Sequence, residues 1–146
     1  MVRLATTIIV ITARTIMTTE AGVLIGSGFT PIFWHLPEDR TVASLPDSRS
    51  LWDQFWEHRA DVVGFAHSHP GADHWPGPSY EDLTTFAAVE RGLGRRLAWW
   101  ITNETSLVAL MWAGPKEYDY EVERVQAERE PPWVVELRNK SKGTKS

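Results

Sequence analysis

The order in which strand-like and helix-like segments follow one another is the feature that most restricts the fold of this chain. Short runs rich in β-branched residues predict strands, and large apolar residues spaced four apart, such as Leu51 and Phe55, predict helices. Strands are expected at 3–13, 23–34, 61–66, 96–102 and 107–112, and helices at 48–59 and from 79 to about 92. This order predicts a mixed α/β (α+β) domain with a mixed β-sheet flanked by helices.

A single domain is expected, because 146 residues of which 42% are hydrophobic suit one core. We predict that it spans 1–137. Residues 138–146 mix basic side chains with Ser, Gly, Thr and Asn, which predicts a flexible, solvated tail. Residues 118–122 alternate apolar and acidic side chains, as a half-exposed strand does, but Val122 and Val125 would also suit a helix, so both readings stay open.

Charge and composition disfavour several classes of function. A net charge of −4 gives no basic footprint for nucleic acid. The chain has no cysteine, so disulfides, a thiol nucleophile and thiolate metal ligands are excluded. The longest apolar run, near 8–11, is far shorter than the ~20 residues of a membrane helix. Residues 3–13 loosely resemble a signal peptide, but Arg14 stands where a small-residue cleavage site belongs, so we predict a cytoplasmic protein.

The sequence His67-Ser-His69-Pro directly follows the strand predicted at 61–66. Side chains two apart on a strand project from the same face, so the two imidazoles can converge on one ion. Asp82 lies in the first turn of the next predicted helix, where it can point back toward the strand end. Two histidines and one carboxylate are a common zinc ligand set that leaves a fourth position for water.

Simpler explanations exist for each of these fragments. A histidine pair at a strand end is often only polar structure, and Ser79-x-x-Asp82 before an apolar helix is first of all an N-capping signature. Among the other histidines, His35 and His58 are expected at the surface. His74, with Trp75, lies in a loop that would either pack on its own domain or contact a substrate.

Together, the fragments resemble the motif of JAMM (MPN+) zinc metalloproteases, a prokaryotic-type member of the MPN superfamily. His-Ser-His-Pro is followed, after a short loop, by Pro-Ser-x-x-Asp-Leu, and a distant upstream acid, Glu20, precedes a small-and-aliphatic strand. The resemblance covers about residues 18–113 and implies a single MPN domain of the cytidine-deaminase-like type. It implies that His67, His69 and Asp82 hold Zn²⁺, that Glu20 transfers the proton, and that Ser79 stabilises the oxyanion.

The chain departs from the family motif at two points. Nine residues, from Pro70 to Pro78, separate the second histidine from Ser79 where the motif usually has seven, but a longer loop changes closure entropy only slowly. Aligning Gly26 with the usual strand-ending glycine places Thr19 at the acid position, and only a gap or bulge restores Glu20. Glu38 is a reserve candidate.

The resemblance also implies an activity, namely hydrolysis of an amide or isopeptide bond. The expected substrate is the C-terminal tail of a ubiquitin-like protein or its conjugates, as in deubiquitinase-like processing. One alternative is a catalytically inactive MPN scaffold that binds protein partners, and another is a general small-peptide metallohydrolase. The motif of RadC-like proteins is less well matched, because an Asn normally stands there in place of Ser68.

Overall fold

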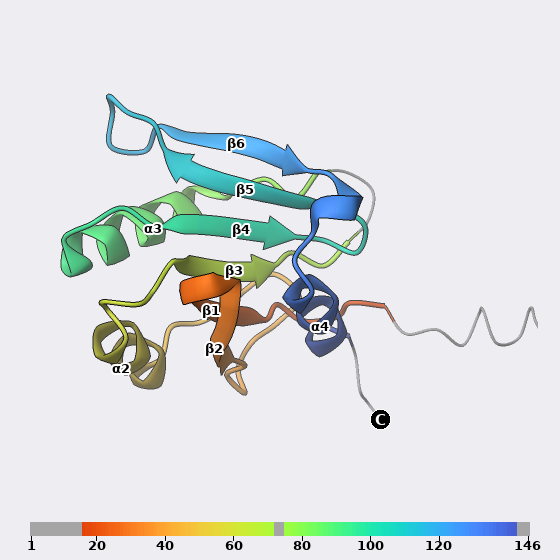
Figure 1. Ribbon diagram of the computed structural model, residues 1–146. Helices are drawn as coiled ribbons and strands as arrows, with labels where there is room; N and C mark the ends of the chain where they lie inside the picture. Colours follow the sequence, from red (N-terminus) through yellow and green to blue (C-terminus); the bar gives the residue numbers. More distant parts are fainter. Residues whose placement is uncertain (1–15, 72–74, 143–146) are drawn as a thin grey trace, which may run out of the picture.

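The computed structural model describes residues 16–71 and 75–142, whose strands form one six-stranded sheet (Figure 1). The strand order is β2-β1-β3-β4-β5-β6. β3 and β4 are parallel, and the other neighbouring strands are antiparallel. The fold is therefore mixed α/β, as the sequence predicted. The strands are β1 (Gly22–Gly26), β2 (Thr30–His35), β3 (Gly64–Ser68), β4 (Ala98–Thr102), β5 (Leu107–Trp112) and β6 (Tyr120–Val125).

Helices cover both faces of this sheet. The helical elements are η1 (Ser27–Phe29), α2 (Arg49–Glu57), α3 (Tyr80–Leu93), η2 (Ala127–Arg129) and α4 (Trp133–Lys140). On one face, α2 and α3 pack their apolar side chains against a core that includes Leu24 and Trp99. On the other face, α4 packs against Val23 and Trp100. Alternate residues of a strand thus enter separate cores, which explains why these strands read as continuous apolar runs.

Helix α3 is the crossover between the parallel strands β3 and β4, a connection that needs a dozen or more residues. The two strands approach very closely at Gly64. A Cβ atom at Gly64 would lie 1.8 Å from the carbonyl oxygen of Ala98. Only glycine fits there, so this residue fixes the approach of β4 to the strand that carries the histidines.

The single strand predicted at 23–34 is wrong, because the chain reverses within it. β1 and β2 form an antiparallel hairpin around the short helix η1. Gly28 has φ 75°, a left-handed conformation that suits glycine. The glycines marked bends, as the sequence indicated, but the bends together reverse the chain.

Other predicted elements correspond closely to the structure. The helix expected at 48–59 is α2, whose first turn is capped by the Ser48 hydroxyl. β4 and β5 form the expected hairpin, in which Asn103 accepts hydrogen bonds from the backbone of Thr105 and Ser106. The ambiguous segment near 118–122 lies mostly in strand β6, paired with β5. The strand predicted at 3–13 lies outside the described residues.

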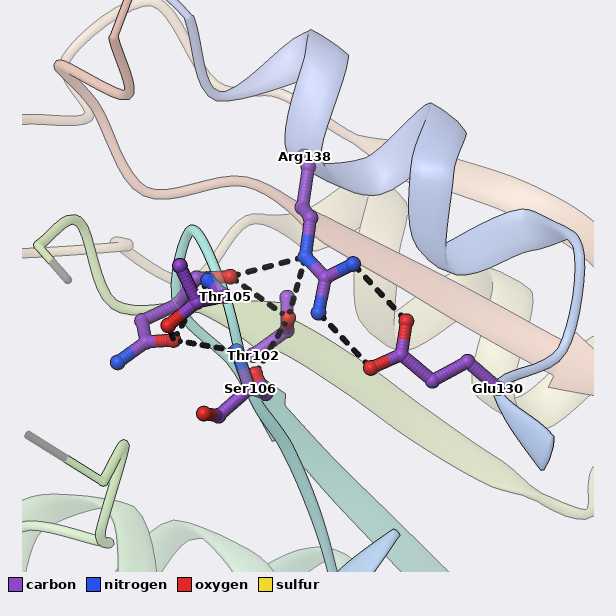
Figure 2. A network of polar contacts seen from close by, with 6 residues as sticks. Thr102, Thr105, Ser106, Glu130 and Arg138 are labelled. Carbon is purple, nitrogen blue, oxygen red and sulfur yellow. Dashed lines mark hydrogen bonds and ion pairs between the residues drawn. The ribbon is translucent and has the colours of Figure 1, made fainter. Parts of the chain in front are cut away.

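The tail predicted from residue 138 is wrong as far as residue 142. Arg138 lies in helix α4, pairs with Glu130 at 2.9 Å, and donates from Nε to Thr102 Oγ1 at 3.0 Å (Figure 2). Ser141 is fully buried, and Lys142 forms a bridge with Met17. The chain between 138 and 142 is therefore docked on the domain. Among the described helices, none has the length and apolar character to cross a membrane.

Candidate metal centre

Two histidines meet at the end of strand β3. His67 belongs to the strand and is buried, and His69 follows its last residue. Their Nε2 atoms are 3.0 Å apart, as expected for side chains that leave the same face of an extended segment. Both Nε2 atoms therefore face the same point, where they could bind one metal ion.

The Asp82 carboxylate reaches the histidine pair from the first turn of α3. Its Oδ1 lies 3.3 Å from Nε2 of His67, and its Oδ2 lies 3.2 Å from Nε2 of His69. The Ser79 backbone N–H donates to Oδ2 at 2.9 Å, and the Asp82 N–H donates to the Ser79 hydroxyl at 3.0 Å. The capping box and the histidine contact thus coexist, and the cap holds the carboxylate in place.

Glu20 also faces the histidines. It precedes β1, which pairs with β3 so that Gly22 lies opposite His67. One potential ligand atom from each of Glu20, His67 and His69 lies within 4.8 Å of the other two. Glu20 is only 7% exposed, whereas the reserve candidate Glu38 is exposed. The structure therefore places Glu20 beside the histidines, and the alignment with Gly26 that favoured Thr19 does not describe this chain.

A network of hydrogen bonds fixes the backbone around Glu20. Its N–H donates to the carbonyl of Thr41 at 2.8 Å, and its carbonyl accepts from Arg40 at 3.1 Å. The next N–H, of Ala21, donates to the hydroxyl of Ser68 at 2.9 Å. That buried hydroxyl also contacts the hydroxyl of Ser141, just after α4. Three segments distant in sequence thus hold Glu20, and sequence patterns gave no signal for this network.

The two carboxylates have opposite electrostatic character. Burial raises the pKa of Glu20 above its ordinary value. Burial would also raise the pKa of Asp82, but hydrogen bonds from His67 and His69 outweigh it and hold that pKa well below its usual range. Burial lowers the pKa of His69, yet the hydrogen bond and charge of Asp82 raise it overall. Asp82 is thus held ionised, as a ligand must be, while Glu20 takes up a proton more readily.

The donor geometry fits a small tetrahedral cation such as zinc. With metal–ligand bonds of ~2.0–2.1 Å, the donors of a tetrahedral zinc site lie about 3.3 Å apart. The two Nε2 atoms are 3.0 Å apart, and the two carboxylate oxygens of Asp82 lie 3.3 Å from that of His67 and 3.2 Å from that of His69, respectively. Glu20 also belongs to a group with the two histidines, in which one ligand atom from each residue lies within 4.8 Å of the other two. Both carboxylates thus lie within reach of an ion held by the histidines, and the contacts of Asp82 match the tetrahedral spacing.

The remaining candidates have varied surroundings. Ser79 is exposed beside Asp82, and its hydroxyl retains a proton to donate after accepting from the Asp82 N–H. His35 was expected at the surface, but it is buried. Its Nε2 donates a hydrogen bond to the Pro46 carbonyl at 2.7 Å. His58 ends α2 and is half-buried. His74 lies outside the described residues.

Trp75 lies near the metal centre and is 51% exposed. Together with His69 and Asn103 it lines a cavity of about 350 Å³. The guanidinium of Arg124, on β6, lies 5.0 Å from its ring centroid. Part of the Trp75 ring thus packs on its own domain, and part is available to a ligand.

The contacts of the two histidines with Asp82, the burial of Glu20 and the cap at Ser79 are all seen in the structure of this chain, without reference to any related protein. The structure brings two imidazoles and two carboxylates, those of His67, His69, Asp82 and Glu20, to line one cavity of about 660 Å³. Comparison of the sequence with protein-family models gave no match, and comparison with curated proteins gave none either.

Proposed function

We propose that this chain is a zinc-dependent metallopeptidase of the JAMM type that hydrolyses an amide or isopeptide bond. The observation that carries the proposal is the convergence of Glu20, His67, His69 and Asp82 from three separate segments. Each fragment alone has a structural explanation, but a purely structural role would not require all four groups to face one point. The resemblance of the His-Ser-His-Pro and Pro-Ser-x-x-Asp-Leu sequences to the JAMM motif supports the same conclusion.

In this proposal, His67, His69 and Asp82 hold the ion. A bound zinc ion supplies a Lewis acid, which polarises a carbonyl and lowers the pKa of a coordinated water from 15.7 toward ~7. Glu20, with its raised pKa, accepts the proton of the attacking water and delivers it to the leaving amine. Ser79 would donate a hydrogen bond from its hydroxyl to the oxygen of the attacked carbonyl as negative charge develops there.

The proposed substrate is the extended C-terminal tail of a ubiquitin-like protein, cleaved in the cytoplasm. An extended tail gains affinity from backbone hydrogen bonds along its length. Trp75, half exposed beside His69, would cover the tail near the metal. A general small-peptide hydrolase would cleave an unrelated peptide and a ubiquitin-like fusion equally well, so comparing the two substrates separates these readings.

The decisive experiment compares Glu20→Gln with Asp82→Ala in the zinc-loaded protein. Glu20→Gln preserves shape and should retain zinc while hydrolysis falls by ~10²–10⁴-fold. Asp82→Ala should lose both zinc and activity, measured by elemental analysis and by cleavage of a ubiquitin-like fusion. Full zinc content without hydrolysis in the wild type would favour the inactive scaffold. Undiminished zinc in Asp82→Ala, His67→Ala and His69→Ala would rule out this site.

A further inference from the structure

The cavity that contains the candidate metal centre continues beyond it, between α2 and α3. Its wall on α3 extends from Asp82 to Val89, and its wall on α2 includes Leu51, Trp52 and Phe55. The segment 42–47 also lines it. Seven residues of helix span ~10 Å. The cavity is therefore long enough to reach past the reacting bond to a side chain one or two residues away.

The part of the cavity beyond the metal ligands is lined mainly by apolar side chains, together with five polar ones: His35, Ser44, Asp47, Thr84 and Thr85. Phe65 and Trp99 on the sheet and Phe86 on α3 form its floor, and the rings of Phe86 and Trp99 stack with centroids 4.2 Å apart. His67 adjoins this floor directly, because its ring centroid lies 6.4 Å from that of Phe86. Apolar surface thus begins immediately beside a metal ligand.

Apart from the histidines and the proposed metal ion, the charged side chains that line the cavity are acidic. The lining residues include the carboxylates of Glu20, Asp47, Glu81 and Asp82, and no lysine or arginine is among the described lining residues. Away from the metal centre, an acidic group of a substrate would lose water on entering an apolar space and would meet the like charge of Asp47. Both effects disfavour an anionic occupant.

We propose that this cavity is a specificity subsite for a bulky, uncharged apolar side chain of the substrate, within two residues of the scissile amide. The inference rests on the proposed hydrolytic function and narrows its substrate class. An aromatic or branched aliphatic side chain buried there raises binding of the substrate about tenfold or more over glycine. Glutamate at the same substrate position is rejected.

Trp52 is the residue that determines this preference. It lines the cavity and is 37% exposed. Its ring lies 6.0 Å from that of Phe55, and its edge is 3.7 Å from the Cβ position of Gly92 on α3. Trp52 therefore reaches from α2 to α3 and forms part of the cavity wall. Trp56, one turn along the same helix, is 56% exposed, lies under Arg59 and does not line the cavity, so it is a matched control.

The test uses fluorogenic peptides in which Phe, Gly or Glu occupies in turn each of the two positions on either side of the scissile bond. With zinc-loaded wild type, Phe at one position should raise kcat/KM about tenfold or more over Gly, and Glu should lower it. Trp52→Ala should reduce the Phe preference to about threefold or less, while Trp56→Ala should keep it. Thr85→Trp, which fills the cavity from an exposed lining position, should also abolish the preference.

Binding of the same peptides to Glu20→Gln, followed by NMR shifts, separates this inference from the hydrolytic function. Phe-selective binding that Trp52→Ala and Thr85→Trp weaken supports the subsite even if no peptide is cleaved by the wild type. Cleavage or binding with no preference among Phe, Gly and Glu at any position would overturn it. Equal losses in Trp52→Ala and Trp56→Ala would overturn the role of Trp52.

Discussion

Arg40 donates a hydrogen bond from Nη1 to the backbone carbonyl of Glu20 at 3.1 Å. The same atom donates to the carbonyl of Lys140, also at 3.1 Å, so one guanidinium joins the candidate proton acceptor to the end of α4. Small displacements of a reacting group can cost ~10²-fold in rate. The position of Glu20 therefore depends on Arg40, which does not itself contact the Nε2 atoms of His67 and His69.

Arg40→Ala should lower kcat by about tenfold or more and leave zinc content and KM nearly unchanged. The reason is that the Glu20 carboxylate would shift, while His67, His69 and Asp82 would keep their positions. In a Glu20→Gln background the same change should have little further effect on kcat, because the group being positioned is already inactive. Steady-state kinetics and elemental analysis of the four proteins provide the measurement.

Arg95 supplies the control for Arg40. It also donates to two backbone carbonyls, those of Arg59 and Val62, but it lies away from the metal centre. Arg95→Ala should therefore lower stability without changing kcat of the folded protein. If both arginine variants reduced kcat equally, Arg40→Ala would act by lowering the stability of the fold and not by displacing Glu20.

The strand and helix order could be predicted from sequence because each element carries its own local pattern. The reversal at Gly28 was missed, since glycines signal bends but not the direction in which the chain continues. Helix α4 was missed although Trp133, Val134 and Leu137 are spaced for one buried face. The basic residues nearby suggested a solvated tail. The contacts of Arg138 with Glu130 and Thr102 show instead that this segment packs on the domain.

The convergence of His67, His69 and Asp82 was predictable because strand and helix geometry orient these side chains within one short stretch. Glu20 was harder to place, because its position depends on pairing between β1 and β3 and not on local spacing. The bonds made by Arg40 and Ser141 join residues distant in sequence. No periodicity of a single sequence encodes such contacts, so this part of the site required the folded structure.

Zinc should stabilise the fold through Asp82. A ligand at 100 times its Kd stabilises by about 2.7 kcal/mol, which raises the Tm of a chain of this size by about 5–10 °C. We expect added zinc to shift the Tm of the wild type by this amount. Asp82→Ala should show no such shift in thermal unfolding followed by circular dichroism, since it lacks one of the three ligands.

Asp82 also belongs to the cap of α3, so its loss destabilises the protein even without zinc. Ser79→Ala removes the capping hydroxyl but no ligand, at a cost of ~0.5–2 kcal/mol. It should therefore lower the Tm of the metal-free protein while keeping most of the zinc-dependent increase. A zinc response lost to the same degree in both variants would show that the cap, and not the carboxylate ligand, underlies the response.

His35 should make stability depend on pH. Burial lowers its pKa below the ordinary value of about 6.5, even though its ring donates to the Pro46 carbonyl. As pH falls below about 6.5, the unfolded chain binds a proton at His35 more readily than the folded one, so the free energy of unfolding decreases. The contribution is present above that pH and is lost as pH falls through the folded-state pKa.

His35→Gln preserves a donor for the Pro46 carbonyl but cannot titrate. The variant should therefore lose less stability than the wild type between about pH 7 and pH 5, as measured by urea unfolding of the metal-free proteins. Both proteins contain His67 and His69, so the difference between the two curves isolates His35. If the free energies of unfolding of the two proteins changed in parallel over this range, His35 would bind a proton equally well in the folded and the unfolded chain. That outcome would contradict the effect expected from the burial of its ring.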